Sequence, residues 1–110
     1  MGDSRDHEGL PRSFFDLVET SEKPVLVDFW AEWCGPCRMV SPAVERVAGE
    51  LSGRVLTVKV NVDRKPDVAG RYGIQGIPTL MLFHHGNVLM RLVGAHPYEE
   101  IRRSVLEALR

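Results

Sequence analysis

The sequence predicts an α/β domain in which a central mixed β-sheet is flanked by helices on both faces. Three observations indicate this fold class. The run Val25–Ala31 (VLVDFWA) is apolar on both of its alternating faces, as expected of a strand that helices cover on each side. Helically spaced and strand-like runs alternate before and after it, which favours parallel strands joined by helices. Two later strand-like runs are separated only by His84-His85-Gly86, a length that suits an antiparallel hairpin.

The first half of the chain predicts a helix, a strand and a longer helix. Ser13–Thr20 has apolar residues at helical spacing behind Ser13, whose side chain can cap a helix N-terminus. Val25–Ala31 follows as the central strand. Within Cys34–Leu51 the apolar residues recur at intervals of three and four, the spacing of an amphipathic helix. Pro42 lies inside this segment and should kink the helix, because it removes one backbone donor.

The second half predicts a strand, a short helix, a hairpin and a final helix. Arg54–Val62 alternates in part between apolar and polar residues, and Asp63–Tyr72 forms a short helix closed by a glycine. Thr79–Phe83 and Asn87–Val93 are the two strands of the hairpin. The last helix begins after Pro97. The resulting sheet is parallel at first and antiparallel at its end.

Length and composition indicate one globular domain. The chain has 110 residues, of which 44% are hydrophobic and 26% charged. We expect residues 1–12 to form a mobile N-terminal tail and residues 13–110 a single domain. The first ten residues are polar and lack the apolar centre of a secretory signal, so the expected location is cytoplasmic.

The charge balance and the apolar runs exclude two classes of partner. Fourteen basic and 15 acidic residues give a net charge of -1, so the chain lacks the excess positive charge that binding to nucleic acid needs. The longest apolar stretch, Pro24–Ala31, is interrupted by Asp28 and is less than half the length that crosses a bilayer. We therefore expect neither nucleic acid nor a membrane as partner.

Both cysteines lie in the segment Trp33–Cys37, with sequence WCGPC. A C-x-x-C pair can close a small disulfide ring or supply half of a tetrahedral metal site. The four histidines lack ligand spacing to these cysteines, so no metal site is expected and they should be surface groups; they are His7, His84, His85 and His96. A purely structural disulfide is disfavoured, because so small a ring constrains little of the unfolded chain.

Three segments together resemble the thioredoxin family: VDFWAEWCGPC (Val27–Cys37), the turn Gly76–Thr79 and the pair Val93-Gly94. The resemblance runs roughly from Ser13 to the end and implies the thioredoxin fold. Family members usually have a further strand before the first helix, whereas the matching region around Arg5–Leu10 is charged here. We therefore expect four well-formed strands, with the fifth edge strand absent or vestigial.

The position of the two cysteines predicts different tasks for them. Cys34 begins a helix, where unpaired N–H groups and the macrodipole favour a thiolate nucleophile. Cys37 is one turn further in, and we expect it to be more buried and to act as the resolving thiol. Between them, Gly35 should permit a close backbone approach, and Pro36 suits an early helical position. In related oxidoreductases a histidine commonly replaces this proline and makes the protein more oxidising, so Pro36 favours a reductant.

Asp28 is a carboxyl group within an apolar strand, where burial would raise its pKa. It could take the proton of Cys37 through a water as that thiol attacks, and the resemblance implies the same role. Lys59 matches a lysine that family members place near this aspartate. The alternative is that Asp28 satisfies a buried hydrogen bond and Lys59 is a solvated strand residue.

The resemblance also implies a surface where substrates dock. The Ile77–Pro78 bond should be cis and lie opposite Cys34, which would leave the backbone of Ile77 free to pair with an extended peptide. Trp30 should pack beneath the site. An apolar rim around Cys34 would comprise Trp33, Gly35, Pro36, Gly76, Val93, Gly94 and Ala95, with Val62 as a less certain member.

These features predict a protein-disulfide reductase that works through Cys34 and Cys37. The resemblance implies a monomer with no bound cofactor, which reduces disulfide-containing proteins and is itself reduced by a thioredoxin reductase. Such proteins serve electron transport and cell redox homeostasis. Two alternatives are a disulfide isomerase or oxidant with the same fold, and a thioredoxin-like subunit that only mediates interactions.

Overall fold

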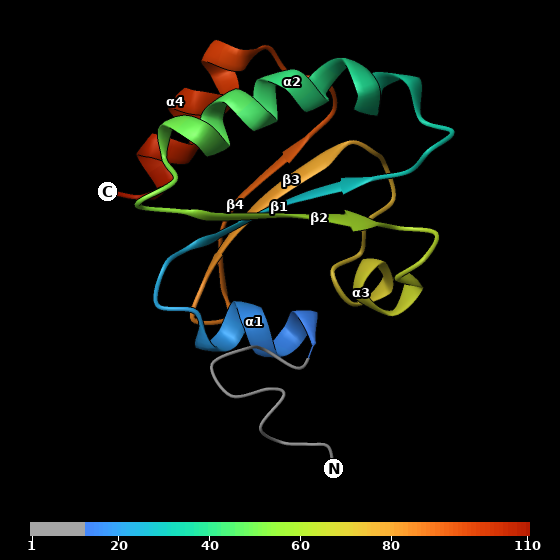
Figure 1. Cartoon of the computed structure of the whole chain (residues 1–110). Coiled ribbons are helices and arrows are strands. Elements are labelled where there is room, and N and C mark those ends of the chain that lie inside the picture. The colour runs from blue at the N-terminus through green and yellow to red at the C-terminus, as the bar shows by residue number, and fades with distance from the viewer. Residues whose placement is uncertain (1–12) are drawn as a thin grey trace.

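A computed structural model describes residues 13–110 of the chain. Helices and strands alternate before a C-terminal hairpin and helix (Figure 1). The elements are α1 (Phe14–Thr20), β1 (Val25–Trp30), α2 (Gly35–Glu50), β2 (Leu56–Asn61), α3 (Pro66–Arg71), β3 (Thr79–His84), β4 (Asn87–Val93) and α4 (Tyr98–Ala108). Every predicted helix and strand of this region is present, in the predicted order.

The four strands form one mixed sheet in the order β2-β1-β3-β4. β1 is parallel to β2 and antiparallel to β3, and β3 and β4 form the antiparallel hairpin. Helices α2 and α4 cover one face of the sheet, and α1 and α3 cover the other (Figure 1). The predicted fold class is therefore confirmed.

The alternation of β1 creates a core on each side of the sheet. Val25, Val27 and Phe29 are fully buried and pack in the cluster that includes residues of α1 and α3. Leu26 points the other way and packs with residues of α2 and α4. Asp28 shares this second face, because it is two positions from Leu26. A single strand thus places a carboxyl group beneath α2.

The boundaries of several elements differ from the predicted ones for local reasons. Cys34 and Ser13 are N-caps, so each helix begins one residue later than predicted. The helix predicted from Asp63 begins only at Pro66, because backbone turns onto Asn61 occupy the intervening residues. α2 continues through Pro42 as one helix.

The C-terminal half of α2 is tied to α4 by a group of polar contacts. The Tyr98 hydroxyl donates to the Glu50 carboxylate at 2.6 Å, and the Arg46 guanidinium lies 3.8 Å from the centre of the Tyr98 ring. Arg102 of α4 also lies 3.6 Å from Glu50. These contacts hold the end of α2 that is remote from the cysteines.

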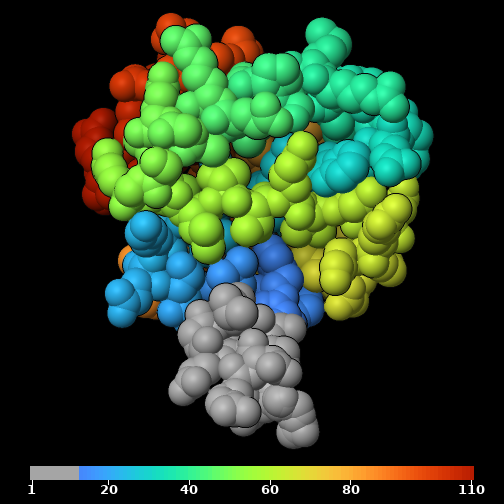
Figure 2. Space-filling view, viewed as in Figure 1, coloured from blue at the N-terminus to red at the C-terminus, as the bar shows by residue number. Residues whose placement is uncertain are grey.

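β2 runs between α2 and α1 across the front of the molecule (Figure 2). Within residues 13–110, β2 and β4 are the two edges of the sheet. The tail expected for residues 1–12, and the absent or vestigial strand expected around Arg5–Leu10, lie outside the described residues. None of the helices in the described part of the chain is long and apolar enough to cross a membrane.

Replacing Phe83 by Ala should destabilise the fold strongly. Phe83 is fully buried, and its ring packs edge-on against Phe14 and Tyr72, with centroids 5.8 and 4.9 Å away. We expect a loss of about 3–5 kcal/mol in the free energy of unfolding, measured by urea denaturation. Leu89→Ala, at a half-exposed position of β4, is the control and should change it by less than about 1 kcal/mol. Similar losses in both variants would contradict this assignment of the core.

Candidate active site

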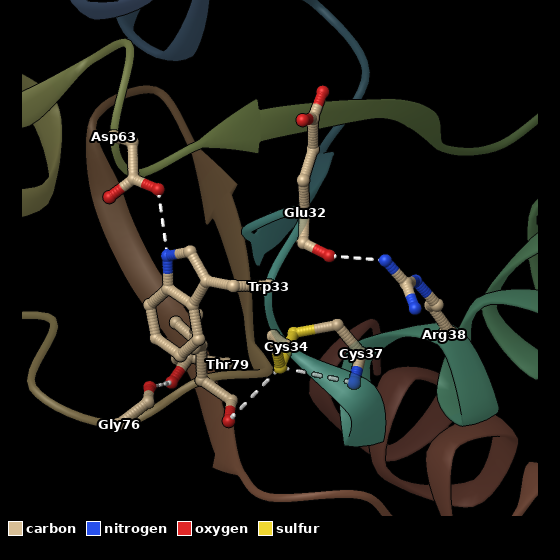
Figure 3. The surroundings of a disulfide bond; sticks show 9 residues. Glu32, Trp33, Cys34, Cys37, Arg38, Asp63, Gly76 and Thr79 are labelled. Carbon is tan, nitrogen blue, oxygen red and sulfur yellow. Dashed lines mark hydrogen bonds between the residues drawn. A yellow bond between two sulfur atoms is a disulfide. The ribbon is translucent and has the colours of Figure 1, made fainter.

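Cys34 and Cys37 are joined by a disulfide at the N-terminus of α2, with their Cα atoms 5.3 Å apart (Figure 3). β1 ends at Trp30, and a tight turn follows in which the Cys34 N–H donates to the Ala31 carbonyl. Cys34 is the N-cap, and its sulfur accepts a hydrogen bond from the Cys37 N–H at 3.1 Å. The helix N-terminus would stabilise a thiolate at this sulfur.

One local expectation for this turn is wrong. Cys37 is not more buried than Cys34, since their exposed fractions are 5% and 3%. The loop before β3 explains this, because the carbonyl oxygen of Ile77 lies 3.8 Å from the Cys34 sulfur and the Ile77 side chain packs against the cluster of Ala31, Cys34 and Cys37. A Cβ built on Gly35 meets no heavy atom within 4 Å outside its chain neighbours and the nearby helix backbone, so the close backbone approach that this glycine permits stays a prediction.

The loop that faces Cys34 is built around a cis peptide bond between Ile77 and Pro78, as expected. Thr79, a buried residue, donates its hydroxyl to the Gly76 carbonyl and closes the turn. The Gly94 N–H donates to the Pro78 carbonyl at 2.8 Å, which fixes the end of β4 beside this turn. The structure therefore brings the Gly76–Thr79 turn, the Val93-Gly94 pair and Cys34 together.

Trp33 is an exposed aromatic residue of this region, with 69% of its surface accessible. Its indole N–H donates to the Asp63 carboxylate at 2.8 Å (Figure 3). Sequence reasoning missed Asp63, which it placed in a helix. The available signal was that Asp63 follows β2 and Trp33 follows β1, and the carboxyl ends of neighbouring parallel strands meet at one sheet edge.

Two of the remaining predicted residues, Trp30 and Val62, pack against the buried cluster of Ala31 and the two cysteines. For Trp30 this is the expected place beneath the site. Pro36 lies in the first turn of α2, and Ala95 continues the loop after Gly94.

A cavity of about 100 Å³ lies behind the disulfide. Asp28 is 1% exposed, and its Oδ1 atom has no hydrogen-bond partner among the described residues. A buried polar atom of this kind needs a partner, and the cavity is large enough for water. Its lining residues are Asp28, Trp30, Cys37, Arg38, Ser41 and Lys59.

Burial raises the pKa of Asp28 from 3.8 to about 6, because the ionised carboxylate loses its hydration. The Lys59 ammonium opposes this rise, and the Glu45 carboxylate adds to it. Lys59 is the parallel-strand partner of Asp28 but is itself exposed. Its ammonium lies 3.4 Å from the Ser41 hydroxyl and 5.3 Å from the centre of the Trp30 ring. Sequence reasoning missed Ser41 and Glu45, which lie one turn apart on α2.

The histidines of the described region are separate from the cysteines. His84 and His85 stack in the β3–β4 hairpin, and His96 lies before α4. Within residues 13–110, no group of three or more histidine, cysteine or acidic side chains could hold a metal ion. His7 lies outside the described residues.

The raised pKa of Asp28 predicts how its removal changes stability with pH. Between pH 3.8 and about 6 the folded chain keeps a proton that the unfolded chain has lost, so stability falls as pH rises through this window. Asp28→Asn should therefore raise the free energy of unfolding at pH 7.5 by up to about 3 kcal/mol and change it much less at pH 4. Urea denaturation at both pH values measures this, and an equal change at both would contradict the assignment.

Comparisons with known proteins agree with this geometry. The sequence model of the family Thioredoxin matches residues 8–107. Thioredoxin 1 of Chlorobaculum tepidum is 55% identical over 100 residues, which cover 91% of this chain and 99% of that protein. Thioredoxin 1 of a Nostoc species is 53% identical over 85 residues, covering 77% and 79% of the two chains. The M-type chloroplastic thioredoxin of Chlamydomonas reinhardtii is 46% identical over 93 residues, covering 84% and 66%. With its cysteine pair at the start of α2 beside a cis-proline turn, the chain belongs to the thioredoxin family of protein-disulfide oxidoreductases.

Proposed function

We propose that the protein reduces disulfide bonds of other proteins, with Cys34 as the nucleophile and Cys37 as the resolving thiol. The observation that carries this assignment is the position of Cys34. Its sulfur caps α2 and accepts the Cys37 N–H, and it lies beside the Ile77 carbonyl of the turn that faces it. Cys37 lies on the inner side, on the wall of the cavity that also holds Asp28.

The reaction has two exchange steps. The Cys34 thiolate attacks one sulfur of the substrate disulfide, so that a mixed disulfide forms and the other substrate sulfur leaves as a thiolate, which takes a proton from water. Cys37 then loses its proton and attacks the Cys34 sulfur, which releases the second substrate thiolate. The substrate gains two electrons and two protons, and the protein is left with the Cys34–Cys37 disulfide found in this structure.

Asp28 is the proposed base of the second step. It shares the cavity with Cys37, its Oδ1 atom is unpartnered, and its pKa of about 6 leaves it able to accept a proton near neutrality. Water in the cavity would carry the proton between the two groups. Lys59 supports the ionised state of Asp28, because its positive charge lowers the pKa of that carboxyl group.

Substrate docking is proposed at the rim around Cys34. Trp33 and Val93 expose 69% and 53% of their surfaces there, which offers apolar contact to a partner. An extended substrate segment would pair with the backbone of Ile77. The rim also includes Gly35, Pro36, Gly76, Pro78, Gly94 and Ala95.

Electrons would come from a thioredoxin reductase, and the protein would act in the cytoplasm as a monomer without a bound cofactor. In that setting it would serve electron transport and cell redox homeostasis. Pro36 occupies the first turn of α2, and the absence of a histidine at this position favours the reductant over the oxidant.

Cys37→Ser should trap substrates on Cys34. Without a resolving thiol the mixed disulfide persists, and mass spectrometry should find the substrate attached to Cys34. Cys34→Ser is the matched control and should trap far less. If Cys34→Ser accumulated the adduct instead, the two cysteine roles would be reversed.

Asp28→Asn should slow the resolving step, because the base is lost while the shape of the side chain is kept. We expect the single-turnover rate at pH 7 to fall by about tenfold or more and its inflection near pH 6 to disappear. Asp67→Asn, at an exposed position of α3, controls for the loss of a carboxylate. An unchanged pH profile in Asp28→Asn would refute the base assignment.

A further inference from the structure

His96 links the docking rim to the start of α4. It lies in the loop between β4 and α4, one residue before the N-cap Pro97. Its Nε2 atom is 2.8 Å from the Val93 carbonyl oxygen, and its Nδ1 atom is 3.1 Å from Glu100 Oε1. Both ring nitrogens therefore face hydrogen-bond acceptors.

Only the protonated ring can satisfy both contacts. A neutral imidazole has one N–H donor, and its other nitrogen accepts, whereas the imidazolium donates at both positions. Consistent with this geometry, the hydrogen bond to Glu100, followed by that to Val93, raises the pKa of His96 above its usual value. The partner from β4 is an uncharged carbonyl, so the charge that faces the ring comes from α4.

The N-terminus of α4 also affects the protonation of His96. The N-terminus of α4 carries partial positive charge and disfavours an imidazolium beside it. Glu99 and Glu100 in the first turn of α4 supply negative charge at the same place. Glu100 is the carboxylate that contacts the ring, and the hydrogen bond to it is the largest cause of the raised pKa of His96.

The carbonyl held by His96 belongs to the surface around Cys34. Gly94, the next residue, has a φ of 100° and donates its N–H to Pro78. A Cβ built on Gly76 lies 3.6 Å from the Val93 side chain, which places Val93 against the cis-proline turn. The turn at Gly94 folds the chain back so that the His96 ring reaches the Val93 carbonyl. His96 thus connects α4 to the loop that borders the nucleophile.

We propose that His96 is a positioning residue, whose protonated ring fixes the rim segment Val93–Ala95 for the docking of protein substrates. Loss of the proton breaks one of the two hydrogen bonds and loosens this segment, so docking weakens as pH rises through the pKa of His96. The proposal rests on the proposed function, because it assigns the rim to substrate binding. His96 does not touch the reacting sulfurs.

The test compares a protein disulfide, in insulin, with the small disulfide 5,5′-dithiobis(2-nitrobenzoate) between pH 5.5 and 9. Both report the cysteine chemistry, but only insulin needs the rim, so the ratio of their kcat/KM values cancels the titration of the thiols. We expect this ratio to fall by about threefold across the titration of His96, through a rise in the KM for insulin. His96→Gln should give a ratio that does not vary with pH, and Glu100→Gln should move the inflection to lower pH.

His85→Asn removes an imidazole from the distant hairpin and is the control, which should keep the wild-type profile; asparagine tolerates the φ of 52° found there. An unchanged profile in His96→Gln, or an inflection that Glu100→Gln does not move, would overturn the role of His96. Failure to reduce either disulfide would instead overturn the proposed function. In that case NMR still tests the contact of His96 with Val93, because the Val93 and Gly94 amides must titrate with the His96 ring. Amides that do not titrate with the ring would refute the proposal.

Discussion

The burial of β1 on both faces is the constraint on which the site depends. Its odd-numbered residues fill the core under α1 and α3, and Leu26 fills the core under α2 and α4. The same alternation directs Asp28 toward α2, where the carboxyl group loses its hydration and its pKa rises. Because β1 ends directly before the turn that leads to Cys34, one strand places both the sulfur nucleophile and the buried acid.

The rest of the site comes from segments that approach this strand end separately. The cis-proline turn before β3 lies against Cys34, and the Gly94 N–H ties the end of β4 to that turn. A third segment, the turn that follows β2, contributes Asp63, whose carboxylate accepts a hydrogen bond from Trp33. At its far end α2 is fixed to α4 through Tyr98 and Glu50. The helix that carries the cysteines is therefore held at both ends.

Much of this arrangement could be predicted from sequence, because it follows from patterns along the chain. The run Val25–Ala31 predicted a strand buried on both faces, and the spacing of apolar residues predicted α2. Contacts between loops could not be predicted in the same way. The bond of Asp63 to Trp33 depends on where two separate turns end in space, and the approach of His96 to Val93 depends on the positive φ of Gly94 between them. The resemblance implied that the Ile77–Pro78 bond lies opposite Cys34, but it did not predict that Cys34 is as fully buried there as Cys37.

The short separation of the two cysteines has a kinetic consequence. Only three positions separate them, so the disulfide closes within one turn of α2 and constrains little of the remaining fold. Reduction of this disulfide would then leave the surface around the Cys34 sulfur largely in place. An electron donor and an electron acceptor must use that surface in turn, because it has no room for both. Turnover should therefore follow a ping-pong order, in which the electron donor acts on the oxidised form and the electron acceptor on the reduced form.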